Sequence, residues 1–292
     1  MMRRPPTGRR RALSTAALLL AVGVLGFGCG GGGASVLEDT ADNLAKVRSG
    51  ELHMAMTASA GAEGDGRPVG FDVTGPFSVA SAAGELPLAR LRHTRLVGKA
   101  LEPTTFVSTG QRAFLEVGGK AYELPPNEVE ALRARDAPKG GGAGLQRLEL
   151  AKWIVDPRVG DGGRLDGVAV QRVTGAVDVV KALNDIVAVA GEVGRAPDEE
   201  LRPVDPAGAD RVKRAVRSST LEVITGRDDH LLRRLRLDIT FAAGDLEALQ
   251  EALGPLAGSS LHFEVDLTGL NRKVEVAAPA EVRPFSELQR RR

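Results

Sequence analysis

The sequence is poor in aromatic residues and contains a single cysteine. Phe, Trp and Tyr make up 3% of its 292 residues, with one Trp and one Tyr, so a site that stacks sugars or bases on aromatic rings is not expected. Because Cys29 is the only cysteine, the chain cannot form an intramolecular disulfide. The 39 basic and 38 acidic residues nearly balance, which removes any global electrostatic basis for binding nucleic acid.

Motifs of the common enzyme and metal-site classes are also lacking. The histidines His53, His93, His230 and His262 are far apart, and none belongs to a His-x-x-x-His pattern, so no metal site is expected. No Gly-x-Ser-x-Gly turn, phosphate loop or dinucleotide fingerprint follows the N-terminal segment. We therefore expect no catalytic residues, no cofactor and a non-enzymatic protein.

The N-terminus has the pattern of an export signal. A basic segment is followed by a stretch without charge that ends at Cys29. This stretch is shorter than the roughly 20 apolar residues that a membrane-spanning helix needs, and it contains Ser14 and Thr15. Residues 1–28 are therefore expected to be a signal peptide. Arg9-Arg10-Arg11-Ala12-Leu13 loosely matches a twin-arginine signal, so the general and the twin-arginine routes both stay open.

Leu25-Gly26-Phe27-Gly28-Cys29-Gly30 resembles the lipobox of bacterial lipoproteins, in which a small residue precedes the cysteine that becomes lipidated. Gly28 and Cys29 fit that pattern, whereas Gly26 and Phe27 depart from it. The alternative is that Cys29 is a small apolar residue near a cleavage site, but a free thiol in an oxidising compartment would be a liability. We expect lipid attachment at Cys29, with residues 29–35 forming the lipidated cysteine and a glycine-rich tether.

Alternating apolar and polar residues predict several β-strands after the tether. The clearest are 235–241 and 261–267, in which every second residue is apolar, so that one face is buried and the other is wet. Further strands are expected at 52–56, 71–79, 86–97, 104–109, 112–117, 120–124 and 164–174, with a bulge or bend at Gly75-Pro76. The short turns Gly110-Gln111 and Gly118-Gly119 favour antiparallel neighbours.

Helical periodicity is confined to shorter segments between these strands. Helices are expected at 35–47, 127–135, 178–193, 206–217 and 245–253, the fourth of them solvated, and a short apolar piece at 145–155 contains Trp153. The sum predicts the α+β class, with a curved antiparallel half-barrel sheet wrapped around helices, and a single domain over residues 36–292.

Four stretches resemble the actinobacterial LppX/LprG group of lipoproteins, which share the curved half-barrel of the carrier LolA. They are Gly119-Lys120-Ala121-Tyr122, Trp153-Ile154-Val155-Asp156-Pro157, residues 167–178, and residues 228–235. The resemblance implies a cavity between sheet and helices that binds acylated lipid or lipoglycan, with no nucleic acid among the ligands. It also implies attachment to the extracytoplasmic face of the plasma membrane through the lipid anchor, and a membrane transporter as a further candidate partner.

The candidate cavity-lining residues come from the apolar faces of the clearest strands. They are Val73, Phe77, Leu235, Leu237, Phe263 and Val265. The alternative interpretation of each is a close-packed core position, since protein interiors are normally filled. At the level of function the main alternative is a surface lipoprotein that binds a protein partner without lipid cargo, and a hydrolase with an unrecognised site is a third class.

Overall fold

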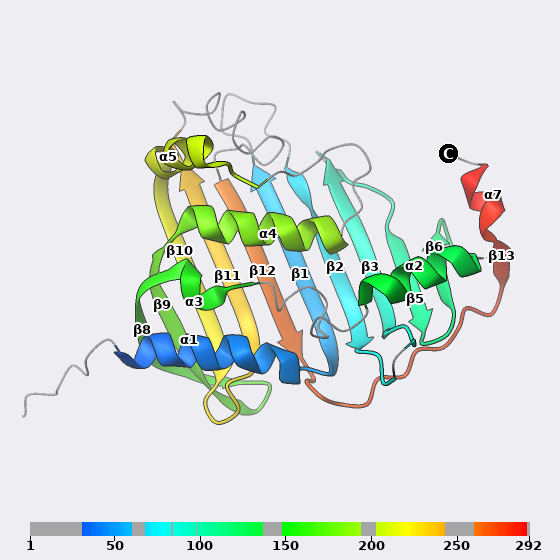
Figure 1. The fold of residues 1–292 in the computed structure, drawn as a ribbon, viewed down its shortest axis with the longest axis horizontal. Helices are drawn as coiled ribbons and strands as arrows, with labels where there is room; N and C mark the ends of the chain where they lie inside the picture. The colour runs from blue at the N-terminus through cyan, green and yellow to red at the C-terminus, as the bar shows by residue number, and fades with distance from the viewer. Residues whose placement is uncertain are drawn as a thin grey trace, which may run out of the picture.

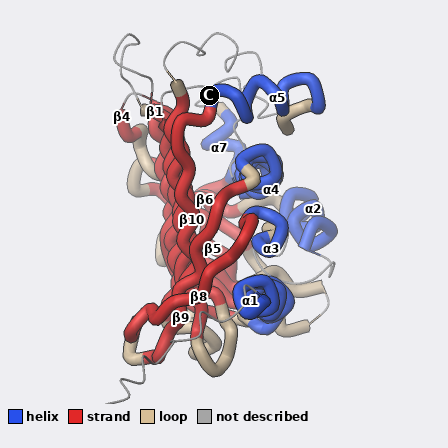
Figure 2. Tube along the Cα trace, turned by 90° about the vertical axis from the view of Figure 1, so that its left-hand side faces the viewer, coloured by secondary structure: helices blue, strands red, loops and turns tan. Residues whose placement is uncertain are grey.

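The computed structural model of the 292-residue chain describes residues 31–59, 68–82, 84–97, 99–136, 148–193, 203–242 and 260–290. The expected signal peptide, Cys29 and the expected helix at 245–253 lie outside these residues. Within the described part, the strands form one open sheet and the helices pack against one of its faces (Figure 1, Figure 2). This is the predicted fold class, a curved and mostly antiparallel sheet around helices, and it is confirmed.

The sheet contains thirteen strands in the described part of the chain. Their order across the sheet is β13-β7-β6-β5-β3-β2-β1-β12-β11-β10-β9-β8, with β4 paired to β3. All pairs are antiparallel except β13 with β7. The bounds are β1 Ser49–Ser59, β2 Val69–Ser78, β3 Leu88–Val97, β4 Lys99–Ala100, β5 Thr104–Thr109, β6 Ala113–Val117, β7 Lys120–Glu123, β8 Ile154–Leu165, β9 Val168–Val177, β10 Val216–Gly226, β11 Leu232–Phe241, β12 Ser260–Thr268 and β13 Val282–Pro284.

The helices lie in a second layer, which Figure 2 shows on one side of the sheet. Their bounds are α1 Gly31–Asn43 with the 3-10 turn η1 Leu44–Lys46, α2 Pro126–Asp136, α3 Leu150–Trp153, α4 Val179–Val193, α5 Pro206–Ala215 and α7 Phe285–Gln289. Their local causes can be read from the sequence. In α5, for example, Asp205 caps the helix by accepting a hydrogen bond from the Gly208 amide at 2.5 Å, and Pro206 follows at the first helical position.

Two predicted turns follow from glycine's access to the left-handed backbone region. Gly118 and Gly119 have φ of +56° and +70° and join β6 to β7 in a two-residue hairpin turn. Gly110 has φ of +90° between β5 and β6. Both turns connect antiparallel neighbours, as the sequence predicts.

Of the bulge or bend expected at Gly75-Pro76, the bulge is wrong, and the bend stays a prediction. Strand β2 keeps its register with β1 through this point, with Gly75 opposite Leu52 and Pro76 opposite Glu51. The pairing with β3 is interrupted there and resumes in the same register at Phe77. Two local features accompany this interruption. Pro76 has no N–H to donate to a neighbouring strand, and Gly75 lies so close to β3 that a Cβ there would be 2.1 Å from the Arg90 carbonyl oxygen. Neither strand contains an inserted residue.

Several elements differ from the sequence prediction. Strands β4, β8, β10 and β13 and helix α7 are not predicted. The predicted strand at 164–174 spans the turn between β8 and β9, where Asp166 and Gly167 have φ of +50° and +80°. The helix expected at 206–217 ends at Ala215, and Arg217 belongs to β10. This helix is not fully solvated either, because Val212 and Ala215 are buried.

Candidate functional site

The helix-facing side of the sheet is apolar across six adjacent strands. Residues opposite each other in antiparallel pairs point to the same face, so each row of partners forms a line across the sheet. One row runs from β2 to β9 through Val73, Met54, Val265, Leu235, Val223 and Val173. The adjacent row is Phe71, Met56, Phe263, Leu237 and Leu221, and it ends at Gly175.

Five of the six candidate cavity residues fall in these two rows, and Phe77 lies further along β2, opposite Gly50. Sequence reasoning did not nominate Met54 and Met56 of β1, which stand second in the first and the second row. Their alternation along the strand was the available signal. All of these side chains belong to one apolar cluster that also includes residues of α1, α3 and α4. The central strands thus share one core with α1, α3 and α4, whereas α2 packs through Val129 on a second, smaller cluster with Leu86 and Ala113.

The interior is closed at the candidate positions. Leu235, Leu237 and Val265 have 0% exposed surface, and Val73 and Phe263 have 1%. A side chain beside a hollow that admits water would keep some accessible surface, so these residues pack directly against their neighbours. In this conformation they form core, and a role in lining a lipid cavity stays a prediction that requires the sheet and helices to separate.

Helix α4 contacts the sheet through apolar side chains alone in the part of the chain that the structure describes. Its buried face consists of Val179, Ala182, Leu183, Ile186, Val187 and Val189. Its polar contacts run elsewhere: Asn184 bonds both backbone groups of Val204, and Asp185 accepts from the Trp153 indole at 2.7 Å. No hydrogen bond or ion pair among the described residues joins α4 to a strand, so this interface can open without unpairing a polar group.

Helix α1 is held differently, by polar contacts to the sheet. The buried Thr40 hydroxyl lies 3.0 Å from the Thr225 hydroxyl of β10 and 2.7 Å from the Val36 carbonyl oxygen of its own helix, and the Thr225 hydroxyl lies 3.2 Å from the Leu231 carbonyl oxygen. The Asn43 amide also donates to the Asp229 carbonyl oxygen at 3.0 Å, in the turn between β10 and β11. Separating α1 from the sheet would break the Thr40–Thr225 contact and the Asn43 bond, and a net hydrogen bond of this kind contributes about 0.5–1.5 kcal/mol.

The helix-facing side becomes polar at β3. His93 lies opposite Val73 and Arg95 lies opposite Phe71, so both side chains share the face of the apolar rows. The His93 ring is 6.3 Å from the Phe71 ring, and burial, followed by the nearby charge of Arg95, lowers the pKa of His93 below its ordinary value. Sequence reasoning missed this pair because polar residues occupy both faces of β3.

The opposite face of the sheet is charged. His53 lies 2.9 Å from Asp72 and His262 lies 2.8 Å from Asp238, which confirms that both histidines stand on the polar sides of their strands. Arg234 pairs with Asp266 in the same region. In the described residues no group of three or more histidine, cysteine or carboxylate side chains could hold a metal ion.

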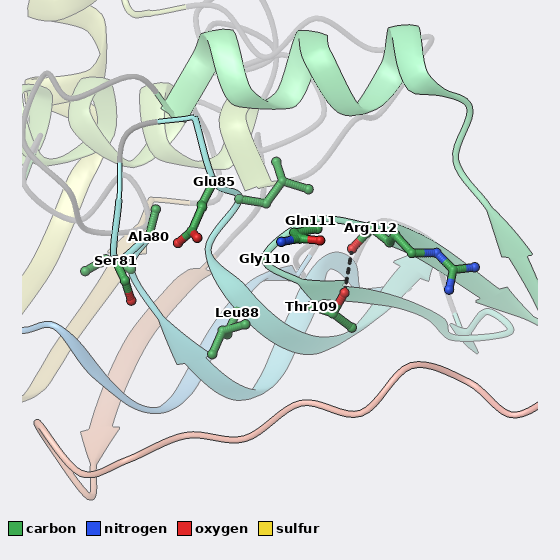
Figure 3. Close-up of a pocket in the computed structure, with 10 residues that line it drawn as sticks. Ala80, Ser81, Glu85, Leu88, Thr109, Gly110, Gln111 and Arg112 are labelled. Atoms are coloured by element: carbon green, nitrogen blue, oxygen red, sulfur yellow. Dashed lines mark hydrogen bonds between the residues drawn. The ribbon is translucent and has the colours of Figure 1, made fainter.

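A pocket of about 420 Å³ lies near the ends of β3 and β5 (Figure 3). Its lining combines Glu85, Gln111 and Arg112 with small and aliphatic residues, and Arg112 is already engaged in a 2.7 Å ion pair with Glu123. That bond holds the pKa of the Glu123 carboxyl below its usual range. The lining includes none of the six candidate residues and none of the residues of the two apolar rows.

Among the helices that the structure describes, none is long and apolar enough to cross a membrane. Comparison with known proteins gives no match to a protein-family model and none to a curated protein sequence.

Solved structures do resemble this fold. LprF from Mycobacterium bovis is 13% identical with a TM-score of 0.41, and the match covers 86% of this chain and 98% of LprF. The lipoprotein LppX from Mycobacterium tuberculosis is 12% identical with a TM-score of 0.37, covering 84% of this chain and 97% of LppX. Both belong to the LppX/LprG group that the sequence resembles.

A complex of MucA and MucB from Pseudomonas aeruginosa also matches, with 13% identity, a TM-score of 0.28, and coverage of 86% of this chain and 59% of the matched chain. At these identities and TM-scores the likenesses assign neither a ligand nor a function to this chain.

Proposed function

We propose that this chain is a lipid-anchored, non-enzymatic lipoprotein of the cell envelope that binds an acylated lipid or lipoglycan between its sheet and its helical layer and carries it across the envelope. Signal peptide 1–28 and the lipidated Cys29 belong to this proposal, as does a single binding domain over 36–292. Of the tether expected at 29–35, residues 31–35 form the start of α1 and pack with the domain. The anchor places the protein on the extracytoplasmic face of the plasma membrane, where a membrane transporter is a candidate partner.

The observation that carries the proposal is the purely apolar contact of α4 with the sheet. An acyl chain inserted there touches the same side chains that now touch each other, so both apolar faces remain out of water. The acyl chain itself gains about 0.8 kcal/mol per buried CH₂, or ~12 kcal/mol for about 15 such groups. This gain opposes the cost of loosening α4.

Helix α4 is also placed to move. Figure 1 shows it crossing the central strands, and its polar contacts reach Trp153 and Val204, neither of which belongs to a strand. The hydrogen bonds of Thr40 and Asn43 retain α1 in the same process. The cavity thus forms beneath α4, and Val73, Leu235, Leu237, Phe263 and Val265 become its floor.

The test is the lipid content of the purified protein. The full chain is expressed with its own N-terminus, released from membranes, separated from bulk lipid and extracted with organic solvent for mass spectrometry. We expect an acylated lipid in near-stoichiometric amount. A Cys29→Ala variant should leave the membrane fraction, because it loses its anchor. Protein that carries no lipid in any preparation would reject the cargo, and equal membrane retention of both proteins would reject the anchor.

A second function is favoured by the closed interior itself. If α4 never leaves the sheet, the protein is a rigid surface module whose ligand is another protein. This alternative predicts no extracted lipid and no change in α4 when lipid is added.

A further inference from the structure

The inner face of the sheet changes character at β3, next to the apolar rows. From the buried Ala89, the helix-facing positions of this strand continue through Leu91, His93 and Arg95 to Val97, which is 49% exposed. Along one strand, therefore, the same face passes from core to solvent. The two polar side chains stand at the transition.

Arg95 is a cation without a partner in the described part of the chain. No carboxylate there lies within ion-pair distance of it, and its side chain makes no hydrogen bond to a described residue. Arg90, by contrast, lies on the opposite face of the same strand and pairs with Glu116 at 2.8 Å. A guanidinium left unpaired beside an apolar face retains its full capacity for a bidentate bond to phosphate or carboxylate.

His93 adds a neutral hydrogen-bonding ring to the same place. Its burial and the charge of Arg95 both disfavour the protonated form and lower its pKa, and it makes no hydrogen bond to a described residue. A neutral imidazole can donate one hydrogen bond and accept another. Leu101, 39% exposed, lies close by, since its amide donates to the Arg95 carbonyl oxygen at 2.8 Å.

Along the helix-facing side of β3, partly or fully buried apolar residues are followed by His93 and Arg95 and then by the exposed Val97. A lipid with an anionic head group has the same order, with acyl chains first and then a charged group that faces water. We propose that Arg95 and His93 form the head-group site of the bound lipid and select a lipid that carries a phosphate or carboxylate next to its acyl chains. The inference rests on the proposed lipid binding. The acyl chains lie on the apolar rows that begin at Phe71 and Val73, the anionic oxygens bond the Arg95 guanidinium, and His93 donates to the same group. Val97 and Leu101 form the apolar rim.

The test compares two lipids with identical brominated acyl chains, the anionic phosphatidylglycerol and the neutral diacylglycerol. Each is titrated into the purified, delipidated full chain, and binding is followed by quenching of Trp153, the only tryptophan in the chain. We expect phosphatidylglycerol to bind about tenfold or more tightly, as one charge-assisted bond contributes. Arg95→Gln should abolish the preference by weakening the anionic lipid alone, and Arg95→Lys should retain part of it.

The matched control is Arg92→Gln. Arg92 is on the same strand but on the opposite face and exposed, so its loss removes the same net charge without touching the site. We expect the preference to survive in this variant. Loss of the preference in both variants, or in neither, overturns the head-group site, and so does an equal affinity of the unaltered protein for the two lipids.

Two further outcomes distinguish a lipid head-group site from a site for free phosphate and from a chain that binds no lipid. If neither lipid binds the unaltered protein, the proposed lipid binding fails and not merely the choice of head group. If glycerol phosphate without acyl chains displaces phosphatidylglycerol at equal concentration, the site takes a free phosphate and the lipid assignment is overturned. A normal unfolding midpoint for Arg95→Gln confirms that any loss arises in the folded protein.

Discussion

Asp185 links the helical layer internally. One of its oxygens accepts from the Trp153 indole at 2.7 Å and from the Glu149 amide at 3.0 Å. Trp153 is fully buried, so its N–H has no access to water as a substitute. This arrangement makes α3 and α4 a unit, which is relevant because the proposed opening moves α4.

Asp185→Ala should therefore lower the free energy of unfolding by about 1–3 kcal/mol, the cost of leaving a buried donor unsatisfied. Urea denaturation followed by Trp153 fluorescence measures it. Glu38→Ala is the control, because Glu38 is an exposed carboxylate on α1, and its effect should stay within about 0.5 kcal/mol. Equal losses in the two variants would show that the indole bond contributes nothing.

His93 gives the stability a specific dependence on pH. Its pKa in the folded chain is lowered from the ordinary 6.5, first by burial and then by Arg95, so between the two values the unfolded chain binds more protons. Protonation of His93 therefore favours the unfolded chain, and it lowers the free energy of unfolding as the pH falls below about 6.5.

His93→Gln removes that contribution. The variant should lose less stability than the unaltered protein between about pH 7.5 and about pH 5, measured by urea denaturation at each pH. If the free energy of unfolding declined equally in both proteins over this range, the lowered pKa of His93 in the folded chain would be contradicted.

At the scale of elements, the alternating strands could be predicted and the irregular ones could not. Strands β11 and β12 alternate without interruption, and their buried faces follow directly. Strand β8 is an edge strand with three glycines and mostly exposed residues, so it has no burial period to detect. In strand β10 the first residue, Val216, is followed by the polar run Arg217-Ser218-Ser219-Thr220. Strand β13 has three residues and depends on pairing with the distant β7.

The packing of α1 against β8 depends on Gly33, which the sequence alone does not distinguish from the adjacent Gly32. A Cβ at Gly33 would lie 2.4 Å from the Pro157 carbonyl oxygen, whereas a Cβ at Gly32 meets nothing within 4 Å. Gly33→Ala should thus force α1 away from β8 and lower the thermal midpoint.

Gly32→Ala, the matched change one residue earlier, should leave that midpoint unchanged or raise it, because alanine favours helix by up to about 1 kcal/mol. The contact of α1 with β8 would be contradicted if the two variants shifted the midpoint in the same direction.

The different attachment of the two long helices predicts different local stability. Helix α4 has apolar contacts to the sheet, and α1 has the Thr40–Thr225 bond in addition. In native-state hydrogen exchange, backbone amides of α4 should exchange faster than those of β1 and β12, and addition of lipid should change the protection of α4 most. Uniform protection of α4 and the central strands, with and without lipid, would contradict a mobile α4.

For the whole molecule, the two faces of the sheet define what sequence could and could not predict. The apolar side of Val73, Leu235 and Val265 follows from alternation, and their burial agrees with it. Arg95 escapes this reasoning because β3 carries arginines at positions 90, 92 and 95 on both faces, and only its register with β2 assigns each to a side. A closed interior is likewise invisible in a sequence, since core and cavity lining have the same composition.

The central claim is that an acyl chain enters between the helical layer and the sheet, and Trp153 reports on this directly. It is the only tryptophan in the chain, it is fully buried, and it belongs to the same apolar cluster as the proposed cavity floor. The measurement is quenching of Trp153 by a lipid with brominated acyl chains, compared with the same lipid without bromine. We expect strong, saturable quenching by the brominated lipid alone. Emission that stays unchanged with both lipids, at concentrations where lipid extraction shows binding, would place the lipid elsewhere and contradict the claim.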